Sequence, residues 1–369
     1  MAPITPIFTA VELNSYKVIG LMSGTSLDGL DLAYCHFYHS EGVWKFELVK
    51  SKTVSYTQSW EQKLQGAINI SSEELLSLDV AYGKFLGAQA NEFIKANKLE
   101  VDFIASHGHT VFHQPEKGFT LQIGSGQEIA IATGKKVISD FRIKDVAFGG
   151  QGAPLVPIGD QLLFGEYIAC LNLGGIANIS FEAGGKRVAF DIGMANMLLN
   201  FLANKLGKTY DASGLIARSG KVDRSLLAQL NSFPYFNQPY PKSLGYEWFL
   251  SEVQPIIEAS AISIKDKLCT AVEHEAIQIG KVLKKEITEK GEVLITGGGA
   301  FNKLMVERIR DYTPSNLKII IPDEATIDFK EAIIFAFMGV LRERDEPNCL
   351  KSVTGASANV SGGEMFYPN

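Results

Sequence analysis

Two short apolar segments flank a polar run near the start of the chain. Val18, Ile19 and Leu21 lead into this run, and residues 32–37 lead out of it. Short apolar segments on either side of turn residues predict two strands joined by a tight turn. The run itself, residues 23–31, reads Ser-Gly-Thr-Ser-Leu-Asp-Gly-Leu-Asp. We expect a strand, turn and return strand at the head of the first half of the chain.

The composition of this turn suggests phosphate binding. Glycine lets backbone N–H groups approach a ligand closely, and successive N–H groups in a turn form a site for an anion. Asp28 and Asp31 would repel a bare phosphate, so the turn favours a magnesium nucleotide. The alternative is ordinary hairpin-turn composition, in which glycine, serine and aspartate are common.

The second half of the chain opens in a similar way. An apolar strand is predicted over 168–173, followed by a glycine turn at 174–178 and a return strand from Ile179. A third strand, 187–190, delivers Asp191 next to a glycine and a helix start. A carboxylate there suits a catalytic base and equally a helix N-cap. The repeat suggests a duplicated fold with the nucleotide phosphates held between its halves.

The remaining pattern alternates strands with helices, which predicts an α/β protein. Further strands are expected over 42–57, 101–105, 121–124, 137–142, 293–296 and 318–322. Helical spacing predicts two helices within 58–98 and single helices over 126–134, 197–206, 267–290 and 331–339. The glycine- and proline-rich segment 148–157 is expected to be the domain crossing. We expect an N-terminal tail (1–16), a first domain (17–155 with about 345–369) and a second domain (156–344).

Polar residues follow two of the predicted strands. His107 and His109 could both reach one zinc ion, but no nearby cysteine or acidic residue completes a tetrahedron. A polar turn facing a ligand at the carboxyl end of a strand is the preferred interpretation. Arg142 could clamp a sugar or phosphate with two parallel bonds, or it could form a surface ion pair with Asp140. Lys242, in a proline-rich loop, could contact substrate or solvent.

Bulk properties exclude several classes of protein. With 369 residues, the chain is long enough for two domains. A formal net charge of −6 argues against a general nucleic-acid or anionic-membrane surface. No apolar run is long enough for a membrane helix, and residues 1–16 do not resemble a secretory signal. The four cysteines are far apart and form no CxxC motif, so a reducing cytoplasm is expected.

Taken in order, the motifs resemble those of the anhydro-N-acetylmuramic acid kinase family, within the actin/hexokinase/Hsp70 superfamily. The resemblance covers residues 18 to about 363. Its matching segments are 20–29, 106–110, 120–124, 140–142, 149–157, 171–179, 296–302, 330–332 and 354–356. It implies a two-domain actin-like ATPase (ribonuclease H-like, duplicated) fold with a central cleft. It also implies a cytoplasmic, Mg-ATP-dependent homodimer that takes part in peptidoglycan recycling.

The resemblance further implies a reaction in which water opens the 1,6-anhydro ring and O6 is phosphorylated. Asp191 would be the catalytic base that deprotonates this water. The residues that the resemblance assigns to ATP binding are Gly24, Thr25, Ser26, Leu27, Asp28, Gly29, Leu30, Asp31, Gly174, Gly175, Asn178, Gly297, Gly298 and Gly299. The last three would lie against adenosine. The residues that it assigns to sugar binding are His107, Thr110, Arg142, Gln151 and Glu331. Those carried over to Mg²⁺, directly or through water, are Asp28 and Asp31.

One segment departs from the family pattern. After the third strand the family usually reads Asp-Thr-Gly-Pro-Gly-Asn, whereas this chain reads Asp-Ile-Gly-Met-Ala-Asn over 191–196. The helix that follows also carries Asn200 where aspartate is common. The lost hydroxyl at Ile192 and the bulkier Met194 and Ala195 could alter how water or substrate is positioned next to Asp191.

Two other functions compete with this one. In an ordinary sugar kinase of the same superfamily, Asp191 would deprotonate a sugar hydroxyl and no ring would be hydrolysed. In a non-enzymatic ATP-binding switch, the chain would bind nucleotide without turnover, but the presence of Asp191 argues against this. A sugar-responsive repressor would need an appended basic segment for DNA, which the sequence lacks.

Overall fold

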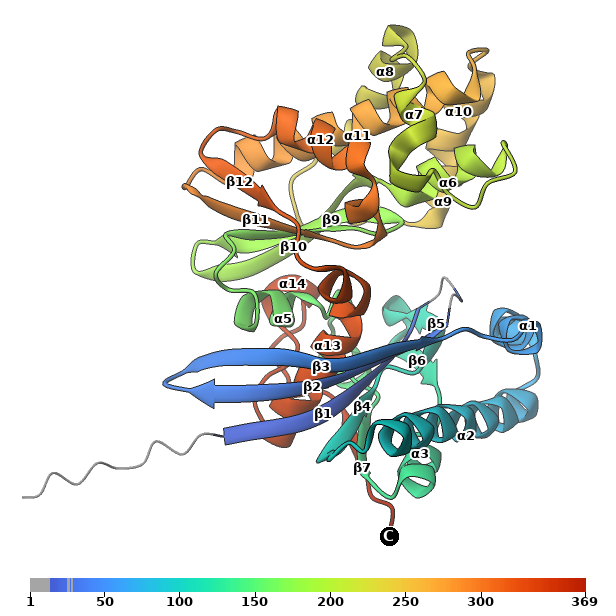
Figure 1. The fold of residues 1–369 in the computed structure, drawn as a ribbon, viewed down its shortest axis with the longest axis vertical. Helices are drawn as coiled ribbons and strands as arrows, with labels where there is room; N and C mark the ends of the chain where they lie inside the picture. Colours follow the sequence, from blue (N-terminus) through green and yellow to red (C-terminus); the bar gives the residue numbers. More distant parts are fainter. Residues whose placement is uncertain (1–13, 25–26, 28) are drawn as a thin grey trace, which may run out of the picture. The chain divides into compact units, whose positions relative to one another are not determined.

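The computed structural model describes residues 14–24, 27 and 29–369. Thr25, Ser26 and Asp28, which the resemblance assigns to nucleotide or metal, therefore lie outside the described residues. The chain folds as two units (Figure 1): unit 1 runs to Leu163 and resumes at Glu331, and unit 2 is Phe164–Lys330. The glycine- and proline-rich segment 148–157, predicted as the domain crossing, lies inside unit 1, and the whole helix predicted over 331–339 belongs to unit 1 as well.

Unit 1 is built on a six-stranded sheet in the order β13-β7-β4-β1-β2-β3. Strands β1, β2 and β3 form an antiparallel meander, β4 and β7 run parallel to β1, and β13 pairs antiparallel with β7. The strands are β1 (Asn14–Ser23), β2 (Leu30–Ser40), β3 (Val43–Val54), β4 (Phe103–Ser106), β7 (Lys136–Ser139) and β13 (Glu364–Phe366), with a separate hairpin of β5 (His109–Gln114) and β6 (Phe119–Ile123).

Both faces of strand β1, inside this sheet, are buried, because its alternate residues contact different helices. Ile19 and Leu21 belong to a core with residues of α2. On the other face, a Cβ placed on Gly20 would lie 1.9 Å from the carbonyl oxygen of Ala332 in α13, so only glycine permits this approach. The helices of unit 1 are α1 (Gln58–Gly66), α2 (Ser72–Asn97), α3 (Gly126–Thr133), α4 (Ile143–Ala147), α5 (Pro157–Leu162), α13 (Glu324–Glu343, which starts in unit 2) and α14 (Lys351–Thr354).

Unit 2 is built on a five-stranded sheet in the order β10-β9-β8-β11-β12. Strands β8, β9 and β10 form an antiparallel meander, and β11 and β12 run parallel to β8. Its strands are β8 (Ala169–Leu173), β9 (Ile176–Ala183), β10 (Lys186–Met194), β11 (Gly291–Thr296) and β12 (Leu317–Ile320). Its helices are α6 (Asn196–Asn204), α7 (Leu215–Arg218), α8 (Arg224–Asn231), α9 (Tyr246–Trp248), α10 (Gln254–Ala259), α11 (Ile264–Glu286) and α12 (Lys303–Tyr312).

The two units share one topology. In each, a three-stranded antiparallel meander is extended from its first strand by two parallel strands, so β3-β2-β1-β4-β7 matches β10-β9-β8-β11-β12. In unit 2, the apolar side of α11 (Leu268, Val272, Ile279) packs into one core with residues of β8, β9 and β10 (Figure 1). The predicted α/β class and duplicated, ribonuclease H-like arrangement of the actin-like ATPases are confirmed.

Several predicted boundaries were wrong; among them, β7 ends at Ser139 and not at Arg142, and β9 begins at Ile176 and not at Ile179. Strand β10 does not end before Asp191 but continues to Met194, because Gly193 and Met194 still pair with β9. Helix α11 ends at Glu286 and does not reach Gly291, since Ile287 has an extended backbone (φ −113°, ψ 90°). Helix α13 extends the predicted helix in both directions. The two helices within 58–98 are confirmed, and α2 starts at the capping box of Ser71 and Glu74.

Candidate active site

Asp191 lies at an irregularity of strand β10. The register of β10 against β9 shifts between Asp191 and Gly193, so Ile192 is an extra residue in the ladder. Such a bulge locally bends a strand and redirects a side chain, and bulges are common next to active sites. The bulge therefore begins directly after Asp191, the last regularly paired residue before it.

Three hydrogen bonds hold Asp191, and all three come from the segment 235–244. The Tyr235 hydroxyl donates to the carbonyl oxygen of Asp191 at 2.7 Å, and the N–H of Asp191 donates to the carbonyl oxygen of Lys242 at 3.2 Å. The N–H of Leu244 donates to Oδ2 of the carboxylate at 2.8 Å. Among the described residues, none donates to Oδ1. One carboxylate oxygen is thus fixed, and the other can accept a proton.

The environment of Asp191 tunes its basicity. Partial burial raises the pKa of the Asp191 carboxyl above its usual value, and the hydrogen bond from Leu244 partly opposes this by stabilising the charged form. A general base works best when its pKa is moderately raised but stays below the working pH. The raised pKa shifts Asp191 in the direction that strengthens a general base.

Polar residues continue across the sheet from Asp191. Asp191 pairs directly with Asn178 in β9, and Asn178 pairs with Asn172 in β8. Directly opposite residues of antiparallel strands place their side chains on the same face. Thr296, the last residue of β11, pairs with Asn172 in turn and accepts a hydrogen bond from Lys330 at 3.3 Å. One row of polar groups therefore connects Asp191 to the end of β11.

The glycine turn between β8 and β9 is fixed to the start of α6. The carbonyl oxygen of Gly174 accepts from the N–H of Asn196 at 3.0 Å, and that of Gly175 accepts from Ala195 at 2.9 Å. The Asn196 side chain also donates to the carbonyl oxygen of Leu173 at 2.9 Å. The turn and the segment after Asp191 consequently form one hydrogen-bonded unit, to which the Asn196 side chain contributes.

The triple glycine after β11 packs against the same end of β8. Gly297 has φ +80°, and a Cβ there would lie 2.5 Å from Oδ1 of Asn172. A Cβ on Gly299 would lie 2.6 Å from Cβ of Leu173. Glycine is therefore required by packing at both positions. Gly298 has more space, because a Cβ there would lie 3.6 Å from its nearest neighbour, Nδ2 of Asn196.

The departures from the family pattern point into the core of unit 2. Ile192, Met194 and Ala195 are each only 2% exposed and belong to its apolar cluster. The hydroxyl lost at Ile192 is therefore replaced by apolar packing, and the side chain contributes to the core of the unit.

In unit 1, His107 and Arg142 form the central contact among the residues that the family resemblance assigns to sugar binding. Nε and Nη2 of Arg142 lie 3.2 and 2.9 Å from Nε2 of His107, while Nη1 donates to the carbonyl oxygen of Gly152 at 2.7 Å. Because Nε2 faces two donors, it accepts, and the proton sits on Nδ1, which donates to the carbonyl oxygen of Gly108 at 3.0 Å. With Nε2 engaged in this way, the arrangement does not support the zinc alternative.

Charges around this contact favour a neutral histidine. Burial and the positive Arg142 together hold the pKa of His107 well below its usual value. Burial also lowers the pKa of Arg142, and the carboxylate of Glu331 opposes that effect. Phe335 flanks both groups, with its ring centroid 4.6 Å from that of His107 and 6.0 Å from the Arg142 guanidinium carbon. His107, Arg142 and Glu331 thus lie near one another.

The other residues assigned to sugar binding, Thr110 and Gln151, have hydrogen-bond partners of their own. Thr110 accepts from the side chain of Gln122 at 3.3 Å on the β5–β6 hairpin. Gln151 is exposed, and its N–H donates to the carbonyl oxygen of Thr354 at 2.8 Å. The segment around Gln151 is anchored by Asp145, whose carboxylate accepts from the N–H of Gly152 at 2.8 Å and from Thr354 Oγ1 at 2.7 Å.

Part of the predicted phosphate loop is described. Leu27 has φ +61°, and its N–H lies 3.4 Å from the carbonyl oxygen of Gly24. A Cβ on Gly29 would lie 2.6 Å from the carbonyl oxygen of Val54. Leu30 is buried in the core, whereas Asp31 accepts a hydrogen bond from Thr53 at 2.6 Å. Within the described part of the chain, no three histidine, cysteine or acidic residues gather as a metal site.

Sequence reasoning missed the residues that hold Asp191. Tyr235 and Leu244 lie 44 and 53 residues away from it. The only local signal is the turn composition of 239–245, which predicts a loop but not what the loop contacts.

The chain is similar to known proteins over its full length. The family model described as anhydro-N-acetylmuramic acid kinase matches residues 16–368. A relative from Shewanella pealeana, named anhydro-N-acetylmuramic acid kinase, is 36% identical over 381 residues, covering 96% of this chain and 100% of the relative. One of the same name from Shewanella oneidensis is 36% identical over 375 residues, covering 96% and 99%.

Solved structures resemble this one distantly. The activator of 2-hydroxyisocaproyl-CoA dehydratase from Clostridium difficile, with bound ADPNP, is 14% identical with a TM-score of 0.42, covering 89% of this chain and 97% of that one. The ROK hexokinase of Thermus thermophilus is 14% identical with a TM-score of 0.36, covering 88% and 99%. The matches to the family model and to the curated relatives are decisive: the chain belongs to the anhydro-N-acetylmuramic acid kinase family and is an ATP-dependent kinase.

Proposed function

We propose that this kinase couples hydrolysis of the 1,6-anhydro ring of 1,6-anhydro-N-acetylmuramic acid to phosphorylation of O6, with Asp191 as the general base. Asp191 takes a proton from a water molecule that attacks C1. The C1–O6 bond breaks, O6 bonds to the γ-phosphorus of ATP, and ADP leaves. The products are N-acetylmuramic acid 6-phosphate, ADP and the proton held by Asp191. This reaction would serve peptidoglycan recycling and amino-sugar catabolism.

The hydrogen bonds that orient Asp191 are the observation that supports this proposal. The carboxylate of a general base must be held in one orientation to accept a proton. The N–H of Leu244 fixes Oδ2 and leaves Oδ1 unoccupied. In-line phosphoryl transfer itself needs positioning and charge neutralisation more than covalent help. Asp191 therefore suits the deprotonation of water, while the remaining residues need only orient the substrates.

The sugar and nucleotide roles carried over from the family form part of the proposal. His107, Arg142 and Glu331 would bind the sugar, since they present a neutral imidazole, a guanidinium and a carboxylate in one place. Thr110 and Gln151 would complete this set. The Gly24–Asp31 turn, Gly174, Gly175 and Asn178 would hold the phosphates, and Gly297–Gly299 would lie against adenosine.

Mg²⁺ fits the residues present. It prefers oxygen ligands and is usually bound through one or two carboxylates plus the substrate's phosphates. Asp31 offers such a carboxylate, oriented by its hydrogen bond from Thr53, and Asp28 lies outside the described residues. When bound, the ion would neutralise charge on the transferred phosphoryl group. We assign Asp31 to this role, either directly or through water.

Location and assembly complete the proposal. The cysteines Cys35, Cys170, Cys269 and Cys349 are all free thiols, which fits a reducing cytoplasm. No helix in the described ranges combines the length and the apolar character needed to cross a membrane. The family resemblance supports a homodimer, which sedimentation analysis of the purified protein would test.

Turnover in ¹⁸O-labelled water tests the reaction. Purified protein, Mg-ATP and the anhydro sugar are mixed, and the sugar product is weighed by mass spectrometry. We expect a 6-phosphate with one ¹⁸O on the sugar, because the attacking water stays at C1. A phosphorylated product without ¹⁸O would show that Asp191 activates a sugar hydroxyl, as in an ordinary sugar kinase.

A further inference from the structure

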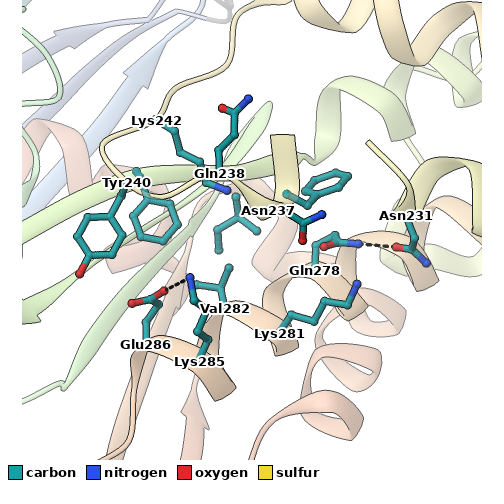
Figure 2. A pocket seen from close by; sticks show the side chains of 13 residues that line it. Asn231, Asn237, Gln238, Tyr240, Lys242, Gln278, Lys281, Val282, Lys285 and Glu286 are labelled. Carbon is teal, nitrogen blue, oxygen red and sulfur yellow. Dashed lines mark hydrogen bonds and ion pairs between the residues drawn. The ribbon is translucent and has the colours of Figure 1, made fainter. Parts of the chain in front are cut away.

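Unit 2 contains a pocket of about 280 Å³ for which the proposed reaction has no use (Figure 2). It lies between the segment 236–242, helix α11 and the end of α8, next to β10. Its charged lining residues are Lys242, Lys281, Lys285 and Glu286. Its other lining residues are Phe190, Ile192, Asn231, Phe236, Asn237, Gln238, Tyr240, Gln278 and Val282. Asp191 is not among them, although its neighbours on both sides are.

The pocket has an excess of positive charge in a protein of net charge −6. Lys242 comes from the loop, and Lys281 and Lys285 come from α11 on the opposite side (Figure 2). Burial, and then repulsion from Lys285, lowers the pKa of Lys242, so these two ammonium groups interact. The one acidic lining residue, Glu286, pairs with Lys285 at 3.0 Å, and no acidic group within the described residues pairs with Lys281.

Hydrogen-bond donors accompany these charges. The side-chain oxygen of Asn231 accepts from Gln278 at 2.5 Å and from Nδ1 of His274 at 2.8 Å. With its oxygen engaged twice, Asn231 has its NH₂ group left to donate. Asn237 and Gln238 add two further carboxamides to the lining. Ammonium and amide groups together recognise a phosphate or carboxylate and the hydroxyls next to it.

The pocket also has an aromatic wall. The rings of Phe190 and Tyr240 are stacked at 5.2 Å with an interplanar angle of 4°. Flat apolar surface beside polar groups suits a molecule with one apolar and one polar face. The volume lies just below the range for ligand pockets, which begins near 300 Å³, so it suits a single ring rather than a nucleotide.

We propose that this pocket binds a small phosphorylated sugar, with its phosphate between Lys281, Lys285 and Lys242 and its ring near Tyr240. The site would be separate from the one that performs the reaction. A carboxylate-bearing sugar could use the same ammonium groups, and the test below distinguishes the two.

Occupancy of the pocket would reach Asp191 through one short segment. Lys242 lines the pocket with its side chain, while its carbonyl oxygen accepts from the N–H of Asp191. Tyr235 and Leu244, on either side, make the other two bonds to Asp191. An anion that draws Lys242 toward α11 would therefore shift the groups that hold the carboxylate. This second half of the inference rests on the proposed function, whereas binding does not.

Calorimetric titration tests binding without any turnover. The probes are glucose 6-phosphate, inorganic phosphate, glucuronate and uncharged glucose. The variants are Lys281→Gln/Lys285→Gln and, as a matched control, Lys284→Gln, which removes an exposed lysine of the same helix that does not line the pocket. We expect glucose 6-phosphate to bind the wild type and Lys284→Gln equally, and the double variant at least about tenfold more weakly.

Each outcome decides the inference. No binding of glucose 6-phosphate to the wild type, or equal binding to all three proteins, would overturn the pocket as a phosphate site. Equal binding of glucuronate and glucose 6-phosphate would show that the pocket recognises any single anion and not phosphate in particular. Binding of glucose equal to that of glucose 6-phosphate would remove the role of the lysines.

Turnover tests the coupling to Asp191. The ratio of kcat with and without saturating glucose 6-phosphate is measured for the same three proteins. We expect a change of at least about twofold in the wild type and Lys284→Gln, and a ratio near one in the double variant. Binding without any change in kcat would overturn the coupling and leave the site. Failure of the ¹⁸O experiment would instead concern the proposed reaction, since the titration does not depend on it.

Discussion

The N–H of Leu244 donates a hydrogen bond of 2.8 Å to Oδ2 of Asp191, although 53 residues separate the two. Leu244 belongs to a loop, whereas Asp191 lies at a bulge of β10. The loop therefore sets the direction of the carboxylate, and the strand sets its position. The carboxylate is oriented by backbone and not by a second charged side chain.

Replacement of Asp191 by asparagine should abolish turnover. The amide cannot accept the proton from water, and general-base catalysis contributes about 10²- to 10⁴-fold. The side chain is nearly isosteric, so binding of an ATP analogue should persist, as measured by calorimetry. Asp311→Asn, at an exposed ion pair of unit 2, is the matched control and should retain full activity. Turnover of Asp191→Asn within a few-fold of the wild type would remove Asp191 as the base.

The pH dependence of kcat/KM should report the raised pKa of Asp191. The base acts only when ionised, so kcat/KM should fall with decreasing pH through that pKa and be constant above it. Because burial raises the pKa above its usual value of 3.8, the midpoint should lie above pH 3.8. Kinetics across this range, with circular dichroism at each pH to confirm folding, would show this. A midpoint at or below 3.8 would contradict it.

Arg142→Lys should weaken sugar binding despite keeping the charge. One ammonium group cannot replace the three guanidinium nitrogens that contact His107 and Gly152. Loss of hydrogen bonds from a charged group costs about 1.5–3 kcal/mol, so KM for the sugar should rise roughly tenfold to a hundredfold. KM for ATP should change little.

The control for this variant is Arg344→Lys, another partly buried arginine of unit 1 that donates to Glu346 and Tyr16. It should leave KM for the sugar unchanged. Equal increases in both variants would indicate a general loss of structure in unit 1 and not a role of Arg142 in sugar binding.

Glu275→Gln should change how stability depends on pH. Glu275 is 3% exposed, and neither carboxyl oxygen has a hydrogen-bond partner among the described residues. Burial raises its pKa well above the usual value. In the unfolded chain the carboxyl ionises near pH 4.3, so the unfolded state loses its proton first as pH rises. Stability is therefore greatest below that pH and falls by about 1.4 kcal/mol per unit until the folded pKa is reached.

The glutamine variant cannot ionise and should lose this slope. Denaturant unfolding of unit 2 between pH 4 and 8 should show the wild type losing stability relative to Glu275→Gln with rising pH. Glu289→Gln, which removes an exposed carboxyl, should follow the wild type. Parallel curves for wild type and Glu275→Gln would show that Glu275 is ionised in the folded protein.

Local pattern was a reliable guide to the elements near the candidate site. The apolar segments around Val18 and Leu32 predicted the β1–β2 hairpin, and the similar start of the second half predicted β8 and β9. These predictions held because a short apolar segment bounded by turn residues is typical of a strand that is buried on both faces. The end of β10 was wrong because a bulge lets a strand continue past a glycine, and this depends on the partner strand.

By itself, the sequence determined the α/β class, the duplicated arrangement, the family and the candidate base, because these follow from periodicity and from ordered motifs within single segments. Only the tertiary structure decided which groups meet. It places Leu244 on Asp191, Arg142 on His107, and Lys242 across a pocket from Lys281 and Lys285. Such contacts join segments far apart in the chain, and they are set by how helices and loops pack on the sheets, which no local pattern encodes.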